Sequence, residues 1–146
     1  MLKKRIIFTL LYKKKNFYLS RNFNHQKIGN IDWLFKNYKF KNLYQDIDEL
    51  VILNIENDKN EKLFDNFCNT VKKISKDLYF PLSAGGQVNS FNRATKIFNS
   101  GCEKVVINSS FFNNQNLVDK ISKLYGSQSI IFSVDYVKKK NNYYVY

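Results

Sequence analysis

The 146-residue sequence lacks the residue types on which several classes of site depend. It has one histidine, His25, and two cysteines, Cys68 and Cys102, none of them with another metal-ligating residue at a useful spacing. We therefore expect no metal site and no cofactor, and we expect both thiols to stay reduced, as in a cytoplasmic protein. No apolar run reaches the roughly 18 residues that a membrane-spanning helix needs, so we expect no membrane partner.

Acidic residues are also scarce. The chain has 12 aspartates and glutamates against 24 lysines and arginines, and its formal net charge is +12. An excess of this kind commonly indicates a nucleic acid or a membrane surface as the partner. Here the basic residues are almost all lysine, asparagine is abundant along the whole chain, and no aromatic–basic motif of the RNA-recognition type occurs. We interpret the charge as a compositional bias and expect no nucleic-acid partner.

The amino terminus has the outline of a signal peptide. A basic start, Met1 to Arg5, precedes a short apolar stretch at residues 6–12. The stretch is short, however, and Lys13 to Lys15 follow it without a small-residue cleavage site. We therefore expect a buried strand here and not a leader.

Short apolar segments alternate along the chain with segments of helical periodicity. Strands are expected at residues 5–12, 47–55, 79–84, 104–107 and 129–134, the first of them buried on both faces. Amphipathic helices are expected from Ile31 to Tyr38, Leu63 to Ile74, Ser90 to Asn99 and Leu117 to Leu124. This order predicts an α/β fold with a parallel sheet covered by helices, and both a doubly wound sheet and a barrel fit it.

The remaining segments are shorter. Residues 17–19 indicate a short ribbon, residues 21–30 a polar loop, and residues 142–146 a strand paired back through a lysine turn. Ser90 is a plausible cap for the third helix, and Asn113 or Asn114 for the fourth.

The carboxyl ends of the predicted strands are more polar than the strands themselves. They carry Leu11, Asn54, Gly85, Gly86, Asn108, Ser109 and Asp135. A Gly-Gly turn leaves backbone N–H groups bare, and a helix start follows each of the two loops at Gly86 and Asn108. This arrangement predicts a phosphate held by Gly85, Gly86 and Asn108. The alternative is a pair of tight turns without a ligand.

Five short motifs stand in the order and spacing of a known family. They are Met1 to Ile7, Asp48 to Val51, Gly85-Gly86, Glu103 to Ser109 and Tyr125 to Gln128. The chain resembles, over essentially all of its length, the cyclase subunit of imidazole glycerol phosphate synthase. The resemblance implies a (β/α)8 barrel that takes ammonia from a glutaminase subunit. In histidine biosynthesis this ammonia splits a phosphoribulosyl-formimino nucleotide, a phosphorylated small-molecule substrate, and an imidazole ring is formed.

A barrel of this kind needs about 250 residues. The resemblance therefore implies a single domain, residues 1–146, that forms the N-terminal half of the barrel: about four βα units and the fifth strand, incomplete at the carboxyl end. We expect either a fragment or a chain completed by another half. The edges of the first and fifth strands are expected to be open.

The family uses two facing aspartates as acid and base, at the ends of the first and fifth strands. Asp135 matches the second aspartate and is implied as catalytic, whereas Leu11 stands in the place of the first. Three further positions depart from the family. Leu19 replaces a substrate-contacting lysine, Asn54 replaces an aspartate, and Gln87 replaces the third glycine of a triplet.

Other family positions are retained. The resemblance implies that Arg5, Glu49 and Lys104 form the charged gate through which ammonia enters the barrel, the alternative being a structural salt bridge. It also implies phosphate contacts at Gly86, Asn108 and Ser109.

Residues 8–12 and 19–23 resemble more closely a divergent branch of the family associated with bacterial surface polysaccharides. That resemblance implies a non-catalytic subunit that channels ammonia toward amidation of a sugar. An inactive truncated product is the third alternative.

Overall fold

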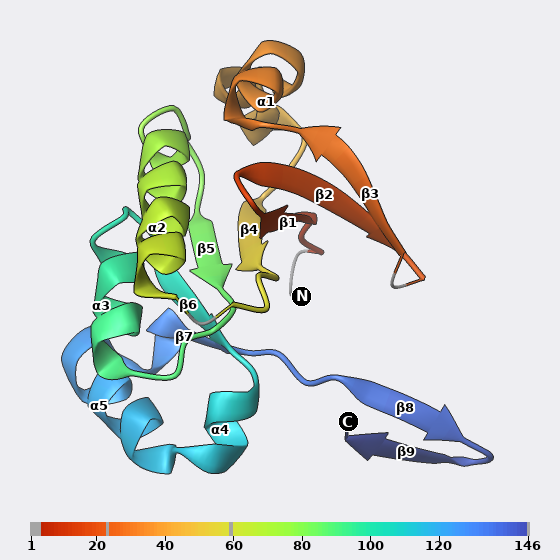
Figure 1. The fold of residues 1–146 in the computed structure, drawn as a ribbon, viewed down its shortest axis with the longest axis vertical. Coiled ribbons are helices and arrows are strands. Elements are labelled where there is room, and N and C mark those ends of the chain that lie inside the picture. Colours follow the sequence, from red (N-terminus) through yellow and green to blue (C-terminus); the bar gives the residue numbers. More distant parts are fainter. Residues whose placement is uncertain (1–3, 23, 59, 146) are drawn as a thin grey trace.

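The computed structural model describes residues 4–22, 24–58 and 60–145. A seven-stranded sheet has the order β3-β2-β1-β4-β5-β6-β7, and a separate hairpin, β8-β9, follows it (Figure 1). The strands are β1 (Ile7–Lys13), β2 (Asn16–Arg21), β3 (Asn24–Gly29), β4 (Glu49–Asn54), β5 (Leu82–Gly85), β6 (Lys104–Ile107), β7 (Ile130–Phe132), β8 (Tyr136–Lys139) and β9 (Asn142–Val145). The helices are α1 (Ile31–Tyr38), α2 (Glu61–Ser75), α3 (Phe91–Phe98), α4 (Ser109–Asn113) and α5 (Gln115–Tyr125), with the 3-10 helices η1 (Phe40–Gln45) and η2 (Ser127–Ser129).

The strands β1, β4, β5, β6 and β7 run parallel to one another. Parallel neighbours require crossover connections, which the helices supply here. The helices α2, α3 and α5 follow one another along the same side of the sheet (Figure 1). The structure thus confirms the predicted α/β architecture: the sheet is open and corresponds to half of a (β/α)8 barrel.

The hydrophobic core lies between the sheet and these helices. Leu10, Leu50 and Ile52 of the strands and Phe64 and Phe67 of α2 are all completely buried in it. Full burial of a side chain of this size stabilises the fold by about 1.5–3 kcal/mol. Because the core fixes the strands against the helices, it also fixes where the strand ends lie.

The first strand is buried on one face only. Leu10 lies in the core, whereas Ile7 is 52% exposed and Thr9 is also exposed. The expectation that β1 is buried on both faces is therefore wrong. Side chains alternate between the two faces of a strand, and the helices cover only one face of the sheet at β1.

The polar segment predicted as a loop at residues 21–30 contains β3, so that prediction is wrong. β3 pairs antiparallel with β2, and β2 pairs in turn with the end of β1 from Leu11 to Lys13. The polar sequence reflects a solvent-exposed ribbon, not the absence of a strand. The ribbon also covers the edge of β1 at its carboxyl end, where an open edge was expected. On the other side, no strand in the described part of the chain pairs with the outer edge of β7.

Four helices begin directly after a polar side chain that caps them. Asparagine side chains cap α1, α2 and α5 by accepting hydrogen bonds from backbone N–H groups, and Ser90 caps α3 in the same way. The predicted caps Ser90 and Asn114 are thereby confirmed. So is the β8-β9 hairpin, apart from Tyr146, which lies outside the described residues. Within residues 4–22, 24–58 and 60–145, no helix has the length and hydropathy required to cross a membrane.

Candidate functional site

A cavity of about 850 Å³ opens at the carboxyl ends of the parallel strands. It gathers six of the seven residues that the sequence places at these ends: Leu11, Asn54, Gly86, Asn108, Ser109 and Asp135. In α/β barrels the active site lies at this end of the strands. The cavity is therefore the candidate functional site.

Asp135 and Asn108 are in direct contact at one side of the cavity. The Nδ2 atom of Asn108 donates a hydrogen bond of 2.8 Å to Oδ2 of Asp135. Asn108 directly follows β6, and Asp135 lies three residues beyond the end of the neighbouring strand, β7. This contact orients the carboxylate while leaving it exposed to the cavity.

Gly85 is the last residue of β5, and Gly86 is the first residue after it; the two glycines have different roles. Gly86 lines the cavity with a φ of +91°, and a Cβ atom there would collide with the carbonyl oxygen of Asn54. Gly85 is buried within β5, where a Cβ atom would collide with the carbonyl oxygen of Val106. The structure therefore does not bring Gly85 to the cavity, and the sheet packing alone accounts for a glycine at that position.

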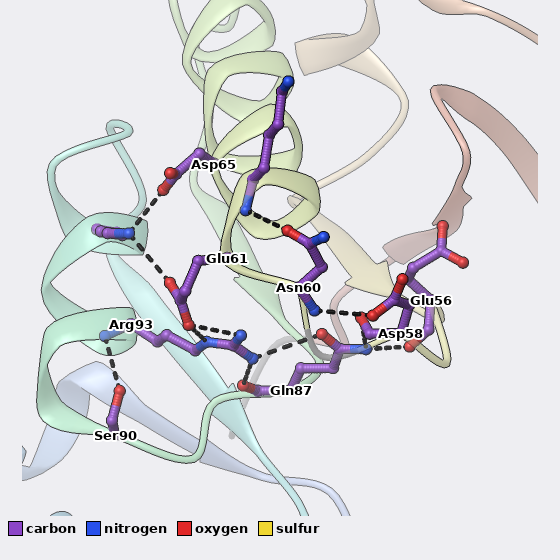
Figure 2. A network of polar contacts seen from close by, with 10 residues as sticks. Glu56, Asp58, Asn60, Glu61, Asp65, Gln87, Ser90 and Arg93 are labelled. Carbon is purple, nitrogen blue, oxygen red and sulfur yellow. Dashed lines mark hydrogen bonds and ion pairs between the residues drawn. The ribbon is translucent and has the colours of Figure 1, made fainter.

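Gln87 connects the loops that follow β4 and β5. Its backbone has a φ of +58°, which is uncommon for a residue other than glycine. Its side-chain amide donates hydrogen bonds to the carbonyl oxygens of Glu56 and Asp58 (Figure 2). The loop on which Gly86 and Gln87 lie is thereby attached to the neighbouring loop.

Arg93 of α3 holds the loop of Gly86 and Gln87 in place. Its guanidinium donates hydrogen bonds of 3.0 Å to the carbonyl oxygen of Gln87 and 2.7 Å to Oε1 of Glu61 (Figure 2). The group is 2% exposed and lies 4.6 Å from the ring centre of Phe64. The hydrogen bond from Arg93, followed by that from Lys96, holds the pKa of Glu61 below its ordinary value. A buried arginine with these partners restricts the movement of the cavity wall.

A second polar cluster lies at the opposite, amino-terminal end of the sheet. Glu49, whose side chain is 2% exposed, accepts hydrogen bonds of 3.0 Å from Arg5, 2.9 Å from Lys104 and 2.5 Å from Ser83. Burial pushes the pKa of Glu49 upward, but the hydrogen bonds from Ser83 and Lys104 and the charges of Lys104 and Arg5 outweigh it, so the pKa is lowered. The structure thus brings Arg5, Glu49 and Lys104 together and adds Ser83, which the sequence did not suggest.

The ribbon supplies cavity residues that were missed. Ser20 of β2 and His25 of β3 both line the cavity. Sequence reasoning treated residues 21–30 as a loop and considered His25 only as a possible metal ligand. The polar residues of β3 gave no signal that a second strand pairs with β2, so the sequence did not show that His25 lies near the carboxyl ends of the parallel strands.

Comparison with known proteins places these features in a family. The model of the family described as "Histidine biosynthesis protein" matches residues 22–146. A protein from Parasynechococcus marenigrum, provisionally named imidazole glycerol phosphate synthase subunit hisF2, is 40% identical over 136 residues, which are 93% of this chain and 50% of that protein. A protein from Buchnera aphidicola named imidazole glycerol phosphate synthase subunit HisF is 35% identical over 124 residues, 84% of this chain and 46% of its own length.

A third relative, from Campylobacter jejuni and also provisionally named subunit hisF2, is 31% identical over 147 residues, 100% of this chain and 56% of its own length. The chain spans about half the length of the curated relatives that it matches. The family match covers most of the chain, and its strands and helices follow the expected order. The chain therefore belongs to the histidine biosynthesis protein family.

Proposed function

We propose that this chain is the N-terminal half of a cyclase-type subunit of imidazole glycerol phosphate synthase, working with ammonia supplied by a glutaminase subunit. The observation that carries the proposal is the pairing of two sites on one sheet. The cavity with Asp135 lies at the carboxyl ends of the strands, and the Glu49 cluster lies at their amino ends. The names of the relatives support the same assignment.

At the cavity, Asp135 is the group proposed to carry a proton. A general acid or base must lie within hydrogen-bonding distance of the atom that it serves, and its side chain must be oriented. The hydrogen bond from Asn108 provides that orientation. The backbone of Gly86 and the residues Asn108 and Ser109 are proposed to hold the phosphate group of the substrate, with Gly85 fixing the turn behind them.

At the other end of the sheet, Arg5, Glu49 and Lys104 are proposed to form the port through which ammonia enters. A buried carboxylate is costly unless it is paired and hydrogen-bonded, and Glu49 has three donors. Arg5 is 46% exposed, so this side of the cluster faces solvent, where a glutaminase would dock. A purely structural ion-pair cluster is the alternative at this position.

We propose that turnover requires a second half of the barrel, because the chain spans about half the length of its relatives. The face of the sheet away from the helices leaves Ile7 of β1 52% exposed and Ile131 of β7 only partly buried. We propose that a complementary half-barrel covers this face in the active protein.

The proposal is tested by measuring ammonia-dependent turnover of the phosphoribulosyl-formimino nucleotide after supplying the missing half and a glutaminase. Wild-type chain should support turnover, and Asp135→Asn should lower it by at least about 100-fold, the scale on which proton transfer contributes. Asp119→Asn, the same change at an exposed position of α5 that does not line the cavity, is the matched control. Absence of turnover with the wild-type chain contradicts the cyclase proposal.

Leu11 favours a second candidate function. It lines the cavity but has no group that can exchange a proton, so the cavity lacks a partner carboxylate at that position. The chain would then conduct ammonia to a different acceptor, such as a sugar, without cyclase chemistry of its own. Under this alternative, the chain stimulates glutamate release by the glutaminase, Glu49→Ala removes the stimulation, and no cyclase product appears.

A further inference from the structure

The β8-β9 hairpin is separate from the rest of the fold. Its two strands pair with each other, and all eight of their residues are exposed. In Figure 1 the hairpin extends away from α2, α3 and α5. An isolated two-stranded hairpin is at best marginally stable in water, and packing against another element stabilises it. No helix or strand in the described part of the chain covers the hairpin, so the surface that covers it lies outside this part of the chain.

Strand pairing gives the hairpin an aromatic face. Tyr136 lies opposite Val145, and Tyr143 lies opposite Lys138, so these four side chains share one face. The rings of Tyr136 and Tyr143 meet edge-on with their centres 5.4 Å apart, and Nζ of Lys138 lies 5.5 Å from the centre of the Tyr143 ring. Tyr136, Tyr143 and Val145 are 64%, 64% and 61% exposed. Clustered tyrosines of this kind are typical of the centre of a protein–protein interface.

The charge of the hairpin indicates what kind of surface covers it. Lys138, Lys139 and Lys140 lie at or next to its turn, and residues 136–145 include no acidic residue. None of the ion pairs found among the described residues includes these lysines. A second copy of this chain would also carry a net charge of +12, so two copies repel each other. A different chain that presents carboxylates fits the hairpin better.

The base of the hairpin lies beside the open edge of the sheet. β8 begins directly after Asp135, which lines the cavity together with Ser133. No strand in the described part of the chain pairs with the outer edge of β7, and such an edge is a place where a further strand adds. The chain spans about half the length of its relatives. A second half that continues the sheet at β7 would therefore lie next to the base of the hairpin.

We propose that the β8-β9 hairpin is an arm that binds the second half of the barrel. Tyr136, Tyr143 and Val145 insert into an apolar groove of that chain, and the lysines at 138–140 face carboxylates at the rim of the groove. This inference rests on the proposed function, because the second half is part of that proposal. It goes further by naming the element that holds the two chains together. Because the hairpin starts at Asp135, the bound arm also fixes this side of the cavity.

Association of the two chains tests the arm directly. The probe is the half of the Parasynechococcus marenigrum protein that this chain does not match, made in the same cells as the full 146-residue chain. The pair is purified through a tag on the probe, and its dissociation constant is measured on dilution. Tyr143→Ala removes the ring at the centre of the aromatic face. Tyr79→Ala is the matched control, because Tyr79 is 71% exposed and lies between α2 and β5, outside the hairpin.

Wild type is expected to form the pair, and Tyr143→Ala is expected to weaken it by about tenfold or more, as the loss of a buried aromatic anchor does. Tyr79→Ala should change the dissociation constant by less than about twofold. Equal affinities of wild type and Tyr143→Ala would overturn the arm, and so would an absence of pairing by wild type. A pair that forms through the arm but shows no turnover contradicts the cyclase proposal alone, whereas turnover by a pair that Tyr143→Ala leaves intact contradicts the arm alone.

The lysines give an independent readout. Glutamine at all three positions 138–140 should weaken the pair at about 0.05 M NaCl, and the difference from wild type should shrink at about 0.5 M NaCl, because salt screens charges. Glutamine at three exposed lysines near the end of α2, Lys72, Lys73 and Lys76, makes the same change in net charge outside the hairpin. Equal weakening by the two triple variants would show that net charge alone matters and would overturn the contact at the lysines.

Hydrogen exchange locates the contact without any substitution. The backbone amides of β8 and β9 should exchange rapidly in the chain alone, because both strands are exposed, and at least about tenfold more slowly in the pair. Exchange that stays as rapid in the pair would overturn the proposal. Sedimentation of the chain alone checks the other occupant: a dimer that Tyr143→Ala dissociates would assign the hairpin to a second copy and would overturn the proposal as well.

Discussion

The guanidinium of Arg93 donates a hydrogen bond of 3.0 Å to the backbone carbonyl of Gln87, whose φ is +58°. A buried side chain of α3 therefore holds a cavity residue in a backbone conformation that it would otherwise seldom adopt. Such a conformation costs on the order of 1–3 kcal/mol and persists only where its surroundings enforce it. The hydrogen bonds from the Gln87 side chain to Glu56 and Asp58 enforce it from the other side.

Arg93→Met tests this support. Methionine keeps the apolar stem against Phe64 but removes the guanidinium donor to the Gln87 carbonyl oxygen, which then accepts only from the backbone N–H of Asn89. We expect the free energy of unfolding to fall by about 1–3 kcal/mol, measured by urea denaturation. Lys96→Met is the control, because it removes an ion pair of the same network at a more exposed position. Equal losses in the two variants would show that Arg93 acts only through surface charge.

Gly86→Ala tests the turn at the cavity wall. Alanine at a φ of +91° is strained, and its Cβ would collide with the Asn54 carbonyl oxygen, part of the backbone. Gly126→Ala is the matched control: its φ of +86° is similar, but its Cβ would meet the flexible side chain of Gln128. We expect a loss of about 1–3 kcal/mol for Gly126→Ala, because its φ of +86° and ψ of +151° suit glycine alone, and a larger loss for Gly86→Ala, where a backbone collision is added. A thermal unfolding series that ranks them in the opposite order would contradict the geometry at Gly86.

The two thiols should be inert in the folded protein. Burial raises the pKa of Cys68 to about 11 and that of Cys102 to about 12, and the thiolate is the reactive form. At pH 8 we expect iodoacetamide to label both cysteines slowly in buffer and rapidly in 6 M urea, as followed by mass spectrometry. Rapid labelling of Cys102 in buffer would indicate that the end of α3 opens readily.

The parallel strands and helices could be predicted from sequence because apolar runs and helical periodicity are local signals. The candidate site at the strand ends could also be predicted, because Asn54 and Asp135 lie at or shortly after the ends of apolar runs that are easily recognised in the sequence. The second strand of the ribbon, β3, could not be predicted, because a solvent-exposed strand of polar residues leaves no apolar pattern, and His25 was missed with it. Ser83 was missed for a different reason: a hydroxyl within an apolar strand gives no sign that it faces Glu49.

Glu49 gives the sharpest prediction of pH dependence. Its pKa in the folded protein lies below the ordinary value of 4.5, so the unfolded chain binds the proton more tightly. The carboxylate therefore contributes stability that is fully present above pH 4.5 and is lost as pH falls through its lower, folded-state pKa.

Glu49→Gln should lower the free energy of unfolding at pH 7 by about 1–3 kcal/mol, because Lys104 and Ser83 lose a charged acceptor. The difference between wild type and Glu49→Gln should shrink below pH 4.5, whereas Glu103→Gln, an exposed change at the start of β6, should leave the profile unchanged. A difference that stays constant from pH 7 to pH 3 would mean that Glu49 is not held as a carboxylate by Arg5, Ser83 and Lys104.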